Sequence, residues 1–394
     1  MHFKVNVMKV LAGLIIIIPI LGRAFRNGLF LFLLAIAAFI AFSYLKQMKF
    51  KVALRKDNII FDLWALTIVM ILYAIINSTI NGITSDTLIR LIQLFTCFFV
   101  LLVASQYKWK RSDYLFIKRM IRIIVFIALA MWPFSGYRTN YYNAMFSHAN
   151  ALGGLLFCYF GLFLMDNNKK SILDSLTLLV MLLLLYFSNS RSALIAAVIY
   201  FFFTFLFLWL KRWRFRWVFF VVLVGCILFP MVYMWLFESD FREALNLFSW
   251  QFFRKRFFSG RQYIWGPLLF YIRDNFLFGL GLAVSPEDLL NNNWSAHNWY
   301  LQSLVQMGIS GLLLVGSSLA CVWNCLYKMR NYVVCRKTSA FMLGMLLWQC
   351  FEVSITQNNF SEGILVWLIL GMGTNKSFIA NINPAVVVTK EKRK

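Results

Sequence analysis

Twelve apolar stretches follow one another along the chain, and they constrain its fold more than any other feature. A helix needs about 20 predominantly apolar residues to cross the roughly 30 Å of hydrocarbon in a bilayer. The sequence therefore predicts an all-α integral membrane protein with about 12 transmembrane helices in a single polytopic membrane domain, residues 1–394. The expected spans are residues 10–22, 28–45, 59–78, 88–106, 120–135, 149–165, 172–187, 193–210, 217–237, 299–327, 338–352 and 363–380.

The excess of positive charge predicts how these spans are oriented. The chain has 39 Lys and Arg against 15 Asp and Glu, a net charge of +24, although 61% of its residues are hydrophobic and only 14% charged. That composition excludes a cytosolic enzyme, so the charge is attributed to membrane topology and not to nucleic-acid binding. If both termini are cytoplasmic, 28 of the 39 cations fall in cytoplasmic segments, as the positive-inside rule requires.

Residues 238–298 form one large external loop, far longer than the usual connection of about two to eight residues between helices. Apolar residues at helical spacing predict a first helix near 241–252. A second helix is expected after Ser259, with a kink at Pro267, and a short third helix capped by Ser285. The alternative is a set of interfacial amphipathic helices that carry no chemistry.

The cysteines and acidic residues indicate which kinds of site are absent. Six of the seven cysteines fall in expected spans and Cys335 falls in a cytoplasmic loop, with no C-x-x-C pair, so the sequence predicts no metal site. Acidic residues are nearly absent from the span interiors, where ion-coupled transporters place them; Asp62, Glu352 and Glu362 lie near span ends. No P-loop motif is present, and no cofactor is predicted.

His148, Arg191 and His297 share one context, because each lies at the outer start of an expected helix. These three helices run from outside to inside, so their unpaired N–H groups and positive dipole ends gather on one side. A helix N-terminus beside an arginine can bind a phosphate, and the same positive end favours a neutral histidine that accepts a proton. The alternatives are an arginine that snorkels to the interface and histidines without a catalytic role.

Three stretches, in this order, resemble the O-antigen ligase and Wzy-type O-antigen (polysaccharide) polymerase superfamily. Residues 147–153 resemble its H-x-N-x-x-G element, and residues 188–193 resemble its S-R-[GS]-A element at the start of a helix. Residues 259–302 resemble its long external loop and the exit from that loop. The resemblance covers roughly residues 140–315. It departs from the family at Gln306, where the family often has a glutamate.

The resemblance implies a metal-independent glycosyltransferase of GT-C-like architecture. Its donor would be a glycan on undecaprenyl pyrophosphate, and its acceptor a sugar hydroxyl. The absence of a carboxylate pair from the first external loop, 23–27, favours the metal-independent mechanism. By residue-level matching, His297 would be the catalytic base, and Arg191 and Arg261 would bind the pyrophosphate. Three further candidates for substrate binding are His148, Asn150 and Asn298. Helix capping by Ser147 and packing by Asn150 would explain two of them equally well.

The leading hypothesis is a polymerase of O-antigen, capsular or exopolysaccharide in the cytoplasmic (inner) membrane of a bacterium, with its active site facing outward. The first alternative is the ligase that transfers the finished polymer to lipid A–core. An alternative of another class is a lipid-linked glycan flippase or exporter. The expected partners are the lipid-linked donor, the glycan acceptor and the bilayer, with a chain-length regulator and a flippase as candidate protein partners and no nucleic acid.

Overall fold

The structure is a computed structural model that describes residues 13, 15–17, 59–135, 141–146, 148–167, 171–253, 256–258, 260–291, 294–357 and 360–382. These residues form helices and no β-strand, which confirms the predicted all-α class for the described part of the chain. The elements, in chain order, are α3 (Ile59–Asn81), α4 (Ser85–Gln106), α5 (Arg111–Ala130), η2 (Pro133–Ser135), α6 (Ala149–Phe163), α7 (Ile172–Ser188), α8 (Arg191–Leu206), α9 (Arg212–Glu238), α10 (Phe241–Phe253), α11 (Gln262–Asp274), α12 (Pro286–Leu289), α13 (Trp299–Lys328), α14 (Val333–Trp348), α15 (Phe360–Thr374) and α16 (Lys376–Ile382).

Helix length and composition support a multi-pass membrane protein. Helices α4, α9, α13 and the part of α3 from Phe61 onward are long and apolar enough to cross a membrane, and α15 with α16 makes a fifth if the bent pair is one span. Helices α6, α7 and α8 are apolar but have only 15 to 17 residues. The count of 12 spans stays a prediction. Of the first two expected spans, the structure describes only residues 13 and 15–17.

The last expected span, residues 363–380, is wrong as a single helix. Two helices, α15 and α16, meet at Asn375 with a bend of 76°. The Asn375 amide donates to the backbone oxygens of Ala104 (2.9 Å) and Tyr107 (2.7 Å) at the end of α4. Its Oδ1 accepts the N–H of Phe378 (2.9 Å), which caps α16. This tertiary contact breaks a stretch that is continuous in hydropathy.

Helix α14 begins and ends earlier than the expected span 338–352, and this changes the position of two cysteines. Cys335, expected in a loop, lies in the first turn of α14 and is fully buried. Cys350, expected inside a span, lies just beyond the end of α14 and is also buried. Beyond the helix, Oε1 of Gln349 accepts the N–H groups of Ser354 (3.1 Å) and Ile355 (3.4 Å), which holds the turn that follows α14.

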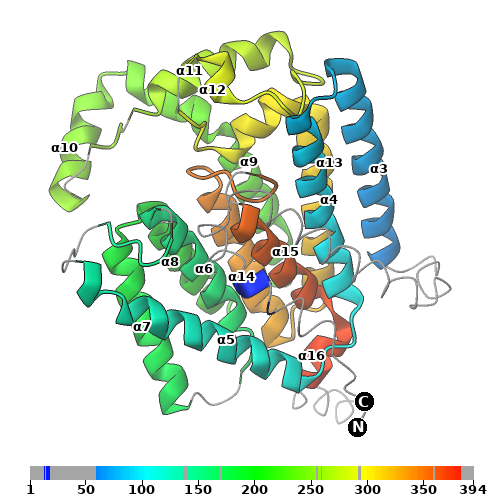
Figure 1. Cartoon of the computed structure of the whole chain (residues 1–394), viewed down its shortest axis with the longest axis vertical. Helices are drawn as coiled ribbons and strands as arrows, with labels where there is room; N and C mark the ends of the chain where they lie inside the picture. The colour runs from blue at the N-terminus through cyan, green and yellow to red at the C-terminus, as the bar shows by residue number, and fades with distance from the viewer. Residues whose placement is uncertain are drawn as a thin grey trace.

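The described part of residues 238–298 contains three helices, as the sequence predicts. The apolar stripe of α11 is buried, and α11 continues through Pro267. Ser285 caps α12 in a capping box with Asp288. Figure 1 shows α10, α11 and α12 together at one end of the molecule, with α10 at its margin. The external location of this loop stays a prediction.

Close packing of small residues brings the first turns of α6 and α8 together. A Cβ atom added at Gly153 would lie 2.5 Å from the Cβ of Ser190 and 3.1 Å from that of Ala193. A Cβ atom added at Gly154 would lie 2.4 Å from the ring of Trp348, the last residue of α14. The starts of α6 and α8 and the end of α14 therefore meet at one place in the bundle.

The packing at Gly153 gives a first prediction. Gly153→Ala should lower the stability of the folded protein by about 1–3 kcal/mol, because the added methyl group overpacks the contact with the Cβ atoms of Ser190 and Ala193. The measurement is the thermal unfolding midpoint of the purified protein in detergent. Ser190→Gly should restore part of the loss in the double variant, because it removes the opposing Cβ.

Gly225→Ala is the matched control, because Gly225 lies inside α9 and a Cβ there would meet nothing within 4 Å. This variant should be neutral or stabilising by about 0.5–1 kcal/mol, the ordinary gain of alanine over glycine in a helix. Equal unfolding midpoints for the Gly153 and Gly225 variants would contradict the packing argument.

Candidate active site

His297 lies in a short connection that is fixed on both sides. The indole N–H of Trp265 donates to the backbone oxygen of Ala296 (2.8 Å). The Asn298 side chain caps α13 by accepting the N–H of Leu301 (2.9 Å). His297 itself has φ 46°, in the left-handed region that a non-glycine residue rarely adopts. Its side chain is 46% exposed, so a strained but anchored backbone presents the imidazole to the space outside the bundle.

The turn after α14 places Glu352 beside this imidazole. One carboxylate oxygen of Glu352, Oε2, lies 3.9 Å from Nδ1 of His297. The other, Oε1, accepts a hydrogen bond from the Asn150 amide (2.9 Å). The Glu352 side chain is only 5% exposed, so the carboxylate acts in a water-poor environment. The sequence analysis did not assign Glu352 to the site; its only signal was an acidic residue at the end of an expected span.

His148 caps α6, a role that the sequence analysis gave to Ser147, whose structure is outside the described residues. The Nδ1 atom of His148 accepts the N–H of Ala151 (3.0 Å). A neutral ring in this arrangement carries its proton on Nε2, which makes His148 a hydrogen-bond donor on its other side. Loss of water around the ring lowers the pKa of His148; Glu352 acts against this shift, and His297 adds to it.

Two arginines border the same space. Arg191 is the first residue of α8, and Arg261 is the N-cap of α11 with its guanidinium carbon 5.4 Å from the centre of the Phe351 ring. Burial lowers the pKa of Arg261, with Glu352 and Tyr233 opposing the shift and Arg191 adding to it. An arginine stays protonated under all these influences. The charges of Glu352 and Arg191 therefore both act on the guanidinium group of Arg261.

The structure therefore brings together five of the six predicted site residues and adds Glu352. The exception is Asn298, which is fully buried, caps α13 and donates to the backbone oxygen of Cys350 (3.1 Å). In the structure, Asn298 holds the connection that carries His297. The contact of Asn298 with substrate stays a prediction. The other predicted residues are His148, Asn150, Arg191, Arg261 and His297.

The arrangement can bind an anion and remove a proton. The first turn of α8 has no side-chain cap, and the guanidinium groups of Arg191 and Arg261 add full positive charge. His297 presents an exposed imidazole with the Glu352 carboxylate beside its ring. Among the described residues, no three His, Cys, Asp or Glu side chains gather where they could hold a metal ion.

The apolar helices of the fold indicate a multi-pass helical membrane protein. Residues 176–316 match the family model Wzy_C, described as O-antigen ligase. This match confirms the predicted resemblance to the O-antigen ligase and polymerase superfamily, and the family implies a glycosyl-transferring enzyme. A search of curated proteins found no match. The matched region contains Arg191, Arg261 and His297, whereas Asn150 and Glu352 lie outside it.

The cap formed by His148 predicts a dependence of stability on pH. The pKa of His148 in the folded protein is lower than in the unfolded chain, where it is about 6.5. Protonation therefore favours the unfolded state, so the stabilising cap is complete above pH ~6.5 and weakens as the pH falls below that value. His148→Asn keeps a good N-cap without a titrating group, so the variant should lose less stability than the wild type on acidification.

The check is the unfolding midpoint of both proteins between about pH 5 and 8, with His148→Ala as the control without a side-chain cap. The alanine variant should be less stable than the asparagine variant by about 0.5–2 kcal/mol at every pH. Parallel pH curves for the wild type and His148→Asn would disprove the titrating cap.

Proposed function

We propose that the protein is a polymerase that joins undecaprenyl-pyrophosphate-linked oligosaccharide repeat units into O-antigen, capsular or exopolysaccharide. The reaction would take place at the outer face of the cytoplasmic membrane. The observation that carries the proposal is the position of the accessible His297 imidazole, next to the buried Glu352 carboxylate and in one site with Arg191 and Arg261. The matched family is the independent support.

In this proposal, His297 removes the proton from a hydroxyl group of the acceptor sugar. Glu352 lies on the Nδ1 side of the ring and favours the tautomer with the proton on Nδ1, which leaves Nε2 to accept the new proton. The acceptor oxygen attacks the anomeric carbon of the donor as the bond from that carbon to the pyrophosphate oxygen breaks. Undecaprenyl pyrophosphate leaves with the bonding electrons.

The arginines act on this leaving group. Negative charge develops on the pyrophosphate as the bond breaks, and Arg191 and Arg261 are cations held by the starts of α8 and α11. Charged donors that are already in place stabilise such a transition state without reorganising at the moment of reaction. The metal-independent character of the mechanism is part of the proposal and follows from the resemblance.

The two alternative functions are a ligase and a flippase or exporter. A ligase would use the same donor and the same base and differ only in its acceptor, lipid A–core; the description of the matched family favours it. A flippase or exporter would need the arginines but not a catalytic base. A chain-length regulator and a flippase are the proposed protein partners of the polymerase.

The first test is the surface glycan of a deletion strain complemented with His297→Ala. Removal of a general base costs about 10²–10⁴ in rate, so the ladder of long chains should collapse to a single repeat unit. Arg330→Ala is the control and should restore the ladder, because Arg330 lies between α13 and α14 and contacts Tyr327 instead of the site. The measurement is gel electrophoresis of the extracted glycan.

The same gel separates the three functions. Long chains that remain on the lipid carrier in the deletion strain, with none on lipid A–core, would indicate the ligase. A full ladder with His297→Ala would show that His297 is not the catalytic base and would favour the flippase or exporter hypothesis.

Glu352→Gln tests the carboxylate separately. The amide keeps the size of the side chain and can still accept from Asn150, but it loses the negative charge beside His297. We expect kcat to fall, though less than in His297→Ala, with little change in KM, because the charge acts on the base and not on the substrate. Glu352→Asp should recover part of the loss. A rise in KM at unchanged kcat would instead indicate that Glu352 contacts substrate.

A further inference from the structure

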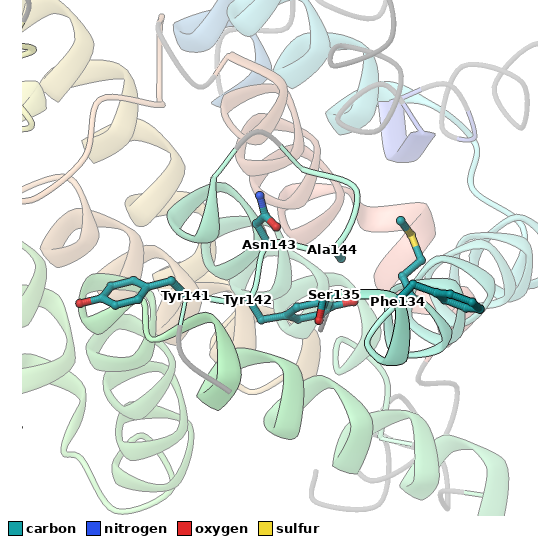
Figure 2. A pocket seen from close by; sticks show the side chains of 7 residues that line it. Phe134, Ser135, Tyr141, Tyr142, Asn143 and Ala144 are labelled. Carbon is teal, nitrogen blue, oxygen red and sulfur yellow. The ribbon is translucent and has the colours of Figure 1, made fainter. Parts of the chain in front are cut away.

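Helices α3, α9 and α13 enclose a cavity of about 330 Å³, at the lower end of the roughly 300–1,000 Å³ of small-molecule sites. The cavity in Figure 2, by contrast, is lined along a single stretch of chain between the end of α5 and the residues before α6. The lining of the first cavity comes from Asp62 and Leu66 of α3, Arg216 and Phe220 of α9, and five residues of α13. The packing of three helices therefore builds this cavity.

The cavity lies at the ends of all three helices. Asp62 is in the first turn of α3, Arg216 is in the second turn of α9, and Tyr327 is the last residue but one of α13. Each of these helices has a segment long and apolar enough to cross a membrane. The ends of such segments lie at the depth of the lipid headgroups. His297 precedes the opposite end of α13, so the cavity belongs to the other face of the membrane.

The lining changes from charged to apolar with depth. In α3, Leu66 lies four residues further into the helix than Asp62, and in α9, Phe220 lies four residues further in than Arg216. Residues four apart share one face of a helix, one turn above the other. In α13, which runs in the opposite direction here, the polar residue Asn324 lies toward the helix end. A phospholipid has the same order, with a charged headgroup first and apolar chains below it.

Two charges of opposite sign line the outer part of the cavity. The side chains of Asp62 and Arg216 belong to exposed residues, and no ion pair joins these two in the described part of the chain. The planar guanidinium group of Arg216 matches the geometry of a phosphate. The carboxylate of Asp62 accepts hydrogen bonds from an ammonium group and repels a second anion. A headgroup that carries both a phosphate and an ammonium group satisfies both side chains.

The floor of the cavity is fixed by aromatic packing. Trp323 of α13 is 1% exposed, and its indole N–H donates to the backbone oxygen of Arg216 (3.3 Å). Its ring stacks on those of Phe215 and Phe219, with centroid distances of 5.1 Å and 5.3 Å. These contacts hold the start of α9 against α13, so the backbone that carries Arg216 is in place before a ligand binds. A preformed site loses little affinity to reorganisation.

We propose that this cavity binds one zwitterionic phospholipid, with the ammonium group of its headgroup at the Asp62 carboxylate and its phosphate at the Arg216 guanidinium group. The acyl chains extend past Leu66 and Phe220 along the surface of α3 and α9. The headgroup then connects α3 to α9 and stabilises the packing of both helices on α13. This inference does not depend on the proposed glycosyl transfer.

The test is native mass spectrometry of the purified full-length protein in detergent, with phosphatidylethanolamine and phosphatidylglycerol added in equal amounts. Both lipids have the phosphate, but only the first has the ammonium group. The wild type should bind phosphatidylethanolamine more tightly by about fivefold, the factor expected for one well-placed exposed ion pair. Asp62→Asn should remove this preference, and Arg216→Gln should weaken the binding of both lipids.

Two variants with the same changes of charge are the controls. Arg214→Gln removes an exposed arginine of α9 that lies over the ring of Trp213 and does not line the cavity. Asp86→Asn removes an aspartate from the first turn of α4, also away from the cavity lining. Both variants should bind the two lipids as the wild type does.

The outcomes against the proposal are distinct. Equal binding of the two lipids by the wild type, or a preference for phosphatidylglycerol, would overturn the zwitterionic site. An unchanged preference in Asp62→Asn would overturn the role of the carboxylate and the proposal with it. Displacement of the lipid by an equal concentration of water-soluble glycerophosphoethanolamine would assign the cavity to a free headgroup compound and reject the lipid.

A second measurement needs no variant and therefore stands even if Asp62→Asn does not fold. A ligand that binds only the folded protein raises its unfolding midpoint. Phosphatidylethanolamine should therefore raise the midpoint of the wild type in detergent more than the same concentration of phosphatidylglycerol does. Equal shifts with the two lipids would contradict the proposal.

Discussion

The candidate site depends on one buried carboxylate among several cationic or proton-accepting groups. Glu352 is 4% exposed, and a carboxylate so far from water must be paired. Its two oxygen atoms face Asn150 and His297, and its charge opposes that of Arg261. These groups come from α6, the connection before α13, the turn after α14 and the start of α11.

Local sequence signals predicted much of this site. Arg191 begins α8, and the long loop forms the three expected helices, because helical spacing and capping act within a few residues. Glu352 could not be found in this way, since it reaches Asn150 across 202 positions of the chain. The break at Asn375 was missed for the same reason, as its amide bonds to α4. Helical periodicity in the sequence predicts where the helices lie, whereas these contacts form only after the helices have packed against one another.

The departure from the family at Gln306 also has a physical explanation. Gln306 is 1% exposed, its amide donates to the backbone oxygen of Val284 (2.9 Å), and it exchanges hydrogen bonds with Gln357. A glutamate here could not donate to Val284 and would bury a charge. Two residues later, Gly308 has φ 61° inside α13, and a Cβ there would lie 2.4 Å from the oxygen of Leu277. The amide and the glycine together dock the long loop onto α13.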